Sequence, residues 1–376
     1  MSKKQKKNKS VFKNGYTFVK KYKTLQEFKL QNGLTVLYMR IPGTEVVTTN
    51  ITYTVGSRDE EKGQTGIAHM LEHMLFKPTL NDLKNKVDSV AMQCERETGC
   101  ILNANTWKDR TTYFFSYPKE HFSRALKIEA DRMHNVVLTD REFLPERNNV
   151  LSEFDMNFGD PYFALSVEIV CSAFYSHPYG HETIGFREDI EGYAIDDLQR
   201  FYKKYYDPAY ATLMVIGDID EKIALTEIVK EFGNQSTEGN KLIVKKIIEP
   251  KQNGLRRVSV ERQSSTNIVG FSIKHSGFPQ KNWYVTSLLA SILANESDSI
   301  LYTKLVDTGL ASKVSMSLEP TSEENIAILY VTLTPKATFE QIEDIVLTTV
   351  WKLTQKDISL NYKKILQKTL TSEIIN

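Results

Sequence analysis

Two histidines and a glutamate stand close together in an otherwise apolar stretch, Gly66–Phe76. His69 and His73 are four residues apart, so in a helix both rings project from one face, where two nitrogens can converge on one metal ion. Glu72 directly precedes His73 and can hold a water molecule beside the ion. The alternative is a buried helix with satisfied histidines, but it would bury three polar groups in five residues without partners, which is costly. The spacing H-x-x-E-H therefore predicts part of a zinc site.

Two further carboxylates lie downstream, in a stretch expected to be helical over 140–158. Glu146 and Glu153 are seven residues apart, and seven helical residues turn by about 700°, about 20° short of two full turns. Both side chains are therefore expected on one face of this helix. One of them can ligate an ion while the other orients the site from behind.

A second histidine pair, His177 and His181, has the same spacing of four. Pro178 and Gly180 lie between them and forbid the regular helical turn that ligation at this spacing requires. We expect loop histidines here and no second metal site.

The composition of the 376 residues is that of a soluble globular protein with room for two domains: 41% hydrophobic, 25% charged and a net charge of +1. A near-neutral chain gives no reason to expect nucleic acid as a partner, and no apolar run reaches the roughly 18 residues that cross a membrane. Cysteines are few and odd in number, which argues against a disulfide framework and favours a reducing, cytoplasmic location; they are Cys94, Cys100 and Cys171.

The chain begins with a basic segment: its first 26 residues hold nine lysines and no Asp or Glu. A secretory signal would need an apolar core, and a mitochondrial presequence is usually rich in arginine, whereas the first arginine is Arg40. A nucleic-acid-binding arm is a third alternative. Because like charges repel and core residues are lacking, we expect residues 1–24 to form a solvated disordered tail.

The hydrophobic pattern predicts an α+β protein. Asn32-Gly33 between two alternating runs predicts a hairpin over 26–38, and Thr65 is placed to cap the motif helix. Further elements of the first half are expected as strands 46–55, 100–117 and 211–216, and as helices 120–134, 140–158, 165–176, 195–206 and 221–232. The second half is expected to hold strands 257–273 and 327–333 and helices 283–308 and 341–353.

A polar stretch with several lysines and a proline predicts a linker at 236–250, between a first domain at 25–235 and a second at 251–376. The order of elements in the second resembles the first. We therefore expect two homologous domains, each an antiparallel-rich sheet packed by helices on one side. The second has no counterpart of strand 211–216 and its closing helix, so we expect it to be truncated.

The motif, the downstream carboxylates and the duplicated layout resemble the insulinase/pitrilysin family of inverzincin zinc peptidases, which includes mitochondrial processing peptidase, over residues 25–355. The resemblance implies His69, His73 and Glu153 as the ligands of one zinc ion per chain. It implies Glu72 as the general base and Glu146 as a supporting carboxylate. Glu153 lies 80 residues after His73, a few more than is usual in the family, and an insertion within 84–97 would account for the difference.

The resemblance also implies how a substrate is bound. An edge strand of the family pairs with an extended peptide by backbone hydrogen bonds, and the matching residues here are Asn103, Ala104, Asn105 and Thr106. Family members commonly add an Arg and a Tyr from a later domain, but Val306 and Ser312 stand at those places. A homologue supplying that pair is therefore implied as the partner in a homo- or heterodimer.

These features predict a zinc-dependent endopeptidase or oligopeptidase that hydrolyses extended or unfolded peptides by a metal-activated water. The alternative from another class is a weakly active or non-catalytic subunit of a heteromeric assembly on the same fold. The ligand residues favour the enzyme, and the absent Arg/Tyr pair favours the subunit. A nucleic-acid-binding protein finds support only in the lysine-rich start of the chain.

Overall fold

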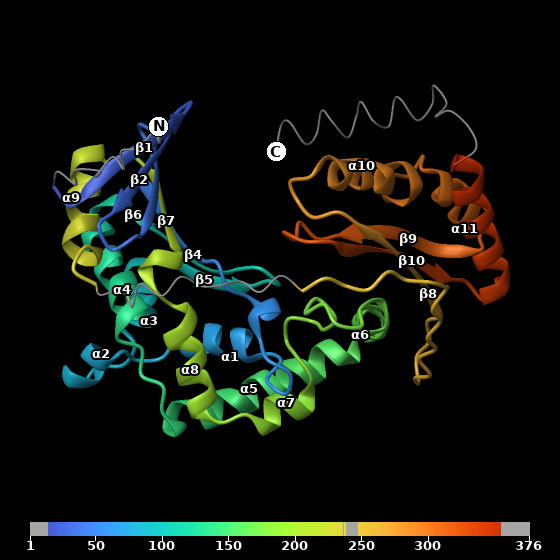
Figure 1. Cartoon of the computed structure of the whole chain (residues 1–376), viewed down its shortest axis with the longest axis horizontal. Helices are drawn as coiled ribbons and strands as arrows, with labels where there is room; N and C mark the ends of the chain where they lie inside the picture. The colour runs from blue at the N-terminus through green and yellow to red at the C-terminus, as the bar shows by residue number, and fades with distance from the viewer. Residues whose placement is uncertain (1–13, 236, 238–246, 355–376) are drawn as a thin grey trace, which may run out of the picture. The chain divides into compact units, whose positions relative to one another are not determined.

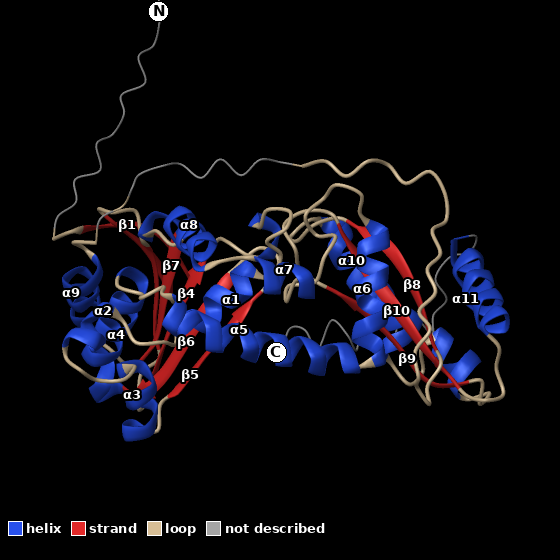
Figure 2. Ribbon diagram, turned by 90° about the horizontal axis from the view of Figure 1, so that it is seen from below, coloured by secondary structure: helices blue, strands red, loops and turns tan. Residues whose placement is uncertain are grey.

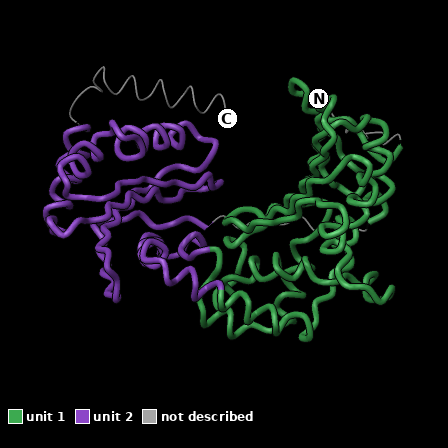
Figure 3. The backbone as a smooth tube through the Cα atoms, turned by 180° about the vertical axis from the view of Figure 1, so that it is seen from behind, with its two compact units in different colours: residues 1–152, 183–246 green, residues 153–182, 247–376 purple. Residues whose placement is uncertain are grey.

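A computed structural model describes residues 14–235, 237 and 247–354. The chain divides into two compact units, which Figure 3 shows in different colours. Unit 1 comprises residues 1–152 and 183–246, and unit 2 comprises residues 153–182 and 247–376. The first division falls inside one continuous helix, α5 (Asp140–Gly159). The expected first domain, 25–235, therefore differs from unit 1, because residues 153–182 group with the second half of the sequence.

Unit 1 is built on a seven-stranded sheet with the strand order β1-β2-β3-β7-β4-β6-β5 (Figure 1). Every neighbouring pair is antiparallel except β3 and β7, which are parallel. This arrangement confirms an antiparallel-rich α+β fold. The strands are β1 (Tyr16–Tyr22), β2 (Leu25–Leu30), β3 (Thr35–Arg40), β4 (Val46–Tyr53), β5 (Ile101–Thr106), β6 (Thr111–Pro118) and β7 (Ala211–Gly217).

The expected hairpin over 26–38 is present as β2 and β3, with Gln26 opposite Tyr38. Gly33 has a φ of 93°, a left-handed conformation that glycine adopts without a steric penalty. The Asn32 amide donates to the Phe232 carbonyl oxygen at 2.8 Å, which ties the turn to the rest of the unit. The expected strand segment 100–117 is two strands, β5 and β6, joined by a turn.

The expectation of a disordered tail over 1–24 is wrong where the structure describes that stretch, because Tyr16–Tyr22 is strand β1. The rings of Tyr16 and Phe18 lie 5.7 and 5.6 Å from the ring of Phe28 on β2. These aromatic contacts across the strand pair stabilise a lysine-rich edge strand that charge alone would disfavour. Residues 1–13 lie outside the described part of the chain.

Helices of unit 1 pack against the sheet and against one another (Figure 2). Helix α1 contacts β5 and α8, and α4 contacts β4, β6 and α9. The helices that begin in this unit are α1 (Ile67–Met74), α2 (Leu80–Lys84), α3 (Val90–Thr98), α4 (Phe122–His134), α5, α7 (Arg187–Gly192), α8 (Ile195–Tyr205) and α9 (Glu221–Phe232). Both α1 and α5 match the helices expected to carry the metal-binding residues.

Unit 2 has a three-stranded antiparallel sheet in the order β8-β10-β9. Its central strand is apolar on both faces: Ala327 and Leu329 join the cluster of α10 and α11, whereas Ile326 and Ile328 pack with α6. The structure thus adds a helix from the first half of the sequence to this sheet. The elements are α6 (Pro161–Ala173), β8 (Ile268–His275), α10 (Lys281–Ala290), β9 (Ala311–Leu318), β10 (Asn325–Leu333) and α11 (Phe339–Thr354).

The strand expected over 257–273 begins only at Ile268. The preceding segment is attached by side chains instead of a backbone ladder. Arg256 donates to the Ser172 carbonyl oxygen at 2.5 Å, and Arg262 donates to the carbonyl oxygen of Phe158. None of the helices in the described part of the chain combines the length and the apolar composition that a membrane-spanning helix needs.

Candidate metal centre

Helix α1 begins at a tightly packed turn. Gly66 precedes it with a φ of 86°, and a Cβ there would lie 2.3 Å from the carbonyl oxygen of Ile184. The Glu60 carboxylate accepts from the backbone N–H groups of Gly66 and Ala68, each at 2.9 Å. Burial raises the pKa of Glu60 well above its usual range, and these two hydrogen bonds act against that rise. The Glu60 carboxyl group, in the preceding loop, therefore satisfies buried backbone N–H groups at the start of α1 that have no partner within the helix.

Thr65 does not cap α1, contrary to the sequence-based expectation. Its backbone N–H and its hydroxyl both donate to Asp189, at 3.0 and 2.6 Å, and its hydroxyl oxygen accepts from Phe186 N–H at 2.9 Å. The left-handed Gly66 lies between Thr65 and the helix, which directs the Thr65 side chain toward the α7 region. Thr65 thus fastens the turn, and Glu60 performs the capping.

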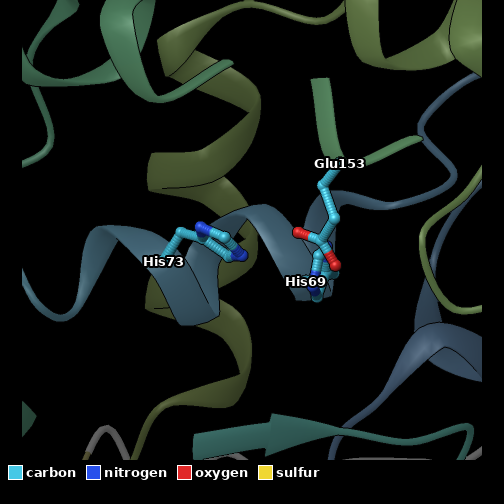
Figure 4. Close-up of side chains that lie close together, drawn as sticks. All are labelled: His69, His73 and Glu153. Atoms are coloured by element: carbon cyan, nitrogen blue, oxygen red, sulfur yellow. The ribbon is translucent and has the colours of Figure 1, made fainter. Parts of the chain in front are cut away.

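His69 and His73 lie one helical turn apart on α1, with ring centroids separated by 4.7 Å and ring planes at 72°. Glu153 on α5 completes a group in which one potential ligand atom of each residue lies within 4.8 Å of the others (Figure 4). Among the described residues this is the one group of three or more His, Cys, Asp or Glu side chains compact enough to hold an ion. Two imidazoles and one carboxylate are a donor set typical of catalytic zinc.

Glu146 lies behind His73, on the same helix as Glu153. Its Oε1 lies 2.9 Å from His73 Nδ1, and its Oε2 accepts from Lys77 Nζ and, at 3.2 Å, from Asn149 Nδ2. Burial alone would raise the pKa of Glu146, but the hydrogen bonds of His73 and Lys77 and their charges lower it to about 2. An ionised Glu146 requires the proton of His73 on Nδ1, which leaves Nε2 as the donor atom for an ion.

Glu72 is 8% exposed and lies between α1 and β5. The Thr106 hydroxyl donates to Glu72 Oε2 at 2.5 Å. At the C-terminal end of α1, Arg132 donates to the Leu75 carbonyl oxygen at 2.9 Å and forms an ion pair with Glu129 at 2.8 Å. Glu72, His73 and the carbonyl oxygen of Leu75 are thus matched by groups outside α1, as burial requires.

Strand β5 occupies one end of the strand order of the seven-stranded sheet, and β6 is its hydrogen-bonded neighbour. Asn103 and Asn105 are exposed, whereas Ala104 and Thr106 are partly buried. The Trp107 indole N–H donates to the Asn105 side-chain oxygen at 2.7 Å. The four residues expected to bind substrate therefore lie together on an edge strand, and the last of them contacts Glu72.

His177 and His181 belong to no group of three potential ligands in the described structure. His177 Nε2 lies 3.3 Å from a Glu323 carboxylate oxygen, and His181 Nδ1 lies 3.0 Å from the Glu182 carbonyl oxygen. His177 thus contacts a residue far along the chain, and His181 contacts its immediate neighbour.

Three supporting residues escaped the sequence-based interpretation: Glu60, Lys77 and Asn149. Lys77 follows His73 by four residues and Asn149 follows Glu146 by three, so helical spacing gave a usable signal for both. Glu60 lies in a loop six residues before Gly66 and carries no such periodicity. Its role depends on how the loop folds back onto α1.

Two family models match the chain. The model described as insulinase (peptidase family M16) matches residues 35–185, and the model described as peptidase M16 inactive domain matches residues 194–366. Together the two matches take in both α1 and α5 and most of unit 2.

Known proteins resemble the chain over most of its length. A relative named zinc protease PqqE, from Helicobacter pylori, is 30% identical over 347 residues, covering 90% of this chain and 77% of that protein. The crystal structure of a protease from Helicobacter pylori matches with a TM-score of 0.87 and 28% identity, covering 93% of this chain and 85% of that one. The periplasmic protease PqqL from Escherichia coli shares the fold, with a TM-score of 0.73 and 18% identity, covering 96% of this chain and 41% of that one.

Proposed function

This chain belongs to the insulinase family of peptidases, peptidase family M16, and we propose that it is a zinc-dependent endopeptidase or oligopeptidase. The proposed substrates are extended or unfolded peptides. The observation that carries the proposal is the convergence of His69, His73 and Glu153 within 4.8 Å. The relatives named zinc proteases support the choice of metal and reaction.

The three residues would hold one zinc ion per chain, with Nε2 of His73 directed by Glu146. Two neutral imidazoles and a carboxylate leave a coordination position for water, which distinguishes a catalytic from a structural zinc site. Zinc in such a site supplies Lewis acidity and lowers the pKa of water to near neutrality. Lys77 and Asn149 hold the second oxygen of Glu146, so the supporting carboxylate has a fixed direction.

Glu72 is proposed as the general base. It accepts a proton from the attacking water at its carboxylate and passes that proton to the leaving amine. Its side chain is mostly buried beside His73, so the carboxylate does not move freely in solvent. Its neighbour Thr106 ends the strand to which the substrate is proposed to bind.

The edge of β5 is the proposed peptide-binding element. An extended peptide adds to a sheet edge through backbone hydrogen bonds, a mode that recognises backbone more than side chains. The end position of β5 in the strand order and the exposure of Asn103 and Asn105 support this proposal. Binding through Asn103–Thr106 would bring the peptide bond near Glu72 and the ligands.

A second subunit is part of the proposal. Val306 belongs to a helical turn and Ser312 to β9, and neither can supply the cation and phenol expected at these places. We therefore propose a dimer in which a homologue, distinct from this chain, contributes the Arg/Tyr pair. The same observation favours the second candidate function, a weakly active or non-catalytic subunit.

A cytoplasmic location is proposed from the low cysteine content.

The test is metal analysis and peptide hydrolysis by the purified chain, alone and with any co-purifying homologue. We expect about one zinc per chain, cleavage of unfolded peptides in preference to folded proteins, and loss of cleavage on chelation with recovery on adding zinc. Cleavage that needs the homologue would support the dimer. Stoichiometric zinc without cleavage in either preparation would favour the non-catalytic subunit and contradict the enzyme.

A further inference from the structure

Thr106 is the last residue of β5, and its side chain contacts the helix that carries the candidate ligands. Its hydroxyl donates to Glu72 Oε2 at 2.5 Å, joining residues 34 positions apart in the sequence. A hydroxyl donating to a carboxylate forms a charge-assisted hydrogen bond, which is short and stronger than a neutral one. This contact distinguishes Thr106 from the other three residues expected to bind substrate.

The pleat of β5 explains why Thr106 faces α1. Leu102 is buried and Thr106 partly buried, whereas the intervening Asn103 and Asn105 are exposed. Side chains two residues apart share a face of a strand, so Leu102, Ala104 and Thr106 lie toward α1, which packs against β5. The side chains of Asn103 and Asn105 point away from α1.

The position of Thr106 is firmly held. It pairs with Thr111 across the turn, where Trp107 N–H donates to the Arg110 carbonyl oxygen at 2.8 Å. The Trp107 carbonyl oxygen accepts from Ser57 N–H at 3.1 Å, and the Thr111 hydroxyl donates to the Val55 carbonyl oxygen at 3.0 Å. A donor placed on such a turn has a defined direction toward Glu72.

We propose that Thr106 is a positioning residue for Glu72, acting through its side-chain hydroxyl. Holding Oε2 fixes the rotation of the carboxylate and therefore the direction of its other oxygen, which takes the proton of water. The inference rests on the proposed function of Glu72 as general base. It also changes the expected role of Thr106: its side chain orients the base, and binding of the peptide is left to the backbone of β5 and to Asn103–Asn105.

The kinetic test compares two substitutions at Thr106. Thr106→Val keeps the shape of the side chain and removes the donor, whereas Thr106→Ser keeps the donor. We expect Thr106→Val to lower kcat about tenfold to hundredfold with KM changed less than about twofold, because a hydrogen bond to a charged group is lost. Thr106→Ser should retain kcat within about threefold. Both variants should bind as much zinc as the unmodified chain.

Thr48→Val is the matched control, since it makes the same change on β4, where the Thr48 hydroxyl lies 2.8 Å from the Ser116 hydroxyl, outside the candidate site. We expect its kcat to be unchanged. An unchanged kcat in Thr106→Val would overturn the proposal. So would a loss confined to KM, which would assign the side chain to substrate binding, or a Thr106→Ser variant as impaired as Thr106→Val.

A measurement without catalysis separates failure of this inference from failure of the proposed function. A double-mutant cycle of Thr106→Val and Glu72→Ala is followed by thermal unfolding of the zinc-free protein. We expect the shifts in Tm to be non-additive by about 2–4 °C, because the two changes remove the same hydrogen bond. Additive shifts would overturn the Thr106–Glu72 contact. A coupled cycle in an inactive protein would leave the contact standing while the peptidase proposal fails.

Discussion

Helices α1 and α10 each pack on the sheet of their own unit, but the side chains on and around them differ in polarity. Helix α1 carries two histidines and a glutamate, whereas α10 contains no His, Asp or Glu. The core around α10 is aliphatic, with Leu301 and Leu305 fully buried. Around α1, other elements provide Glu60, Thr106 and Glu146, together with Lys77, which follows α1 itself.

The difference shows what the candidate metal centre requires of a helix that packs on a sheet. The packing around α10 is apolar, and burial of aliphatic side chains needs no specific partner. The polar groups of α1 need donors and acceptors at defined positions, because a buried polar group without a partner is costly. Substitutions near α1 should therefore change metal binding and activity, and substitutions near α10 should change stability.

The largest effect is expected on removing Glu153, the proposed carboxylate ligand. Glu153→Ala should reduce bound zinc from about one per chain to none and abolish peptide hydrolysis, since two imidazoles alone hold the ion weakly. Elemental analysis after gel filtration measures the metal. Glu142→Ala, a partly buried glutamate of the same helix, is the control and should retain zinc. A zinc-loaded, active Glu153→Ala variant would remove Glu153 from the ligand set.

Removing the proposed general base should strongly lower turnover without loss of metal. Glu72→Gln should bind zinc as the unmodified chain does and lower kcat by about two to four orders of magnitude, because proton transfer is lost while the ligands stay. Zinc content and steady-state hydrolysis of one unfolded peptide are measured on the same preparation. Retained activity in Glu72→Gln would contradict the role of Glu72 as general base.

In the core of unit 2, we expect a substitution to lower stability without changing zinc content. Leu301→Ala removes a fully buried side chain and should lower the free energy of unfolding by about 3 kcal/mol, from lost burial and the cavity left behind. Denaturant unfolding measures the change, and zinc content should stay the same. A Leu301→Ala variant that lost zinc at full stability would contradict the division of roles between the two helices.

A smaller effect is expected at the carboxylate behind His73. Glu146→Gln should weaken zinc binding about tenfold to hundredfold, since it no longer fixes the His73 proton on Nδ1. Competition with a fluorescent chelator measures the affinity. Lys77→Met should weaken binding less, because Asn149 still contacts Glu146. Equal affinities in all three proteins would show that His73 is oriented by other groups.

The smallest effect is expected from pH. The pKa of Glu146 is lowered from 4.5 to about 2 in the folded chain, so its contribution to stability is present above pH 4.5 and is lost as pH falls toward 2. The contribution is at most about 3–4 kcal/mol, since one pKa unit corresponds to about 1.4 kcal/mol. Thermal unfolding of the zinc-free protein between pH 5 and 3 should show a shallower decline for Glu146→Gln than for the unmodified chain. Identical pH profiles would contradict the lowered pKa.

Local features of the protein were determined by the sequence alone. The spacing of His69 and His73 places both rings on one face of a helix, and Asn32-Gly33 predicts the turn between β2 and β3. Apolar residues at period two predict β4, the apolar run Ala211–Ile216 predicts β7, and the amphipathic pattern of Glu221–Phe232 predicts α9. These outcomes depend on neighbours a few positions apart, whose geometry the backbone periodicity dictates.

The tertiary structure decided which distant groups meet. From their spacing in α5, either Glu146 or Glu153 could be the ligand, and the family resemblance implied Glu153. In the structure, Glu146 contacts His73 Nδ1, and Glu153 lies near both histidine rings. Thr106 reaches Glu72 only because β5 lies against α1. Helix α6 was expected in the first domain, but its apolar side chains pack against those of β10. Contacts between residues far apart in the chain depend on packing, and no local pattern encodes them.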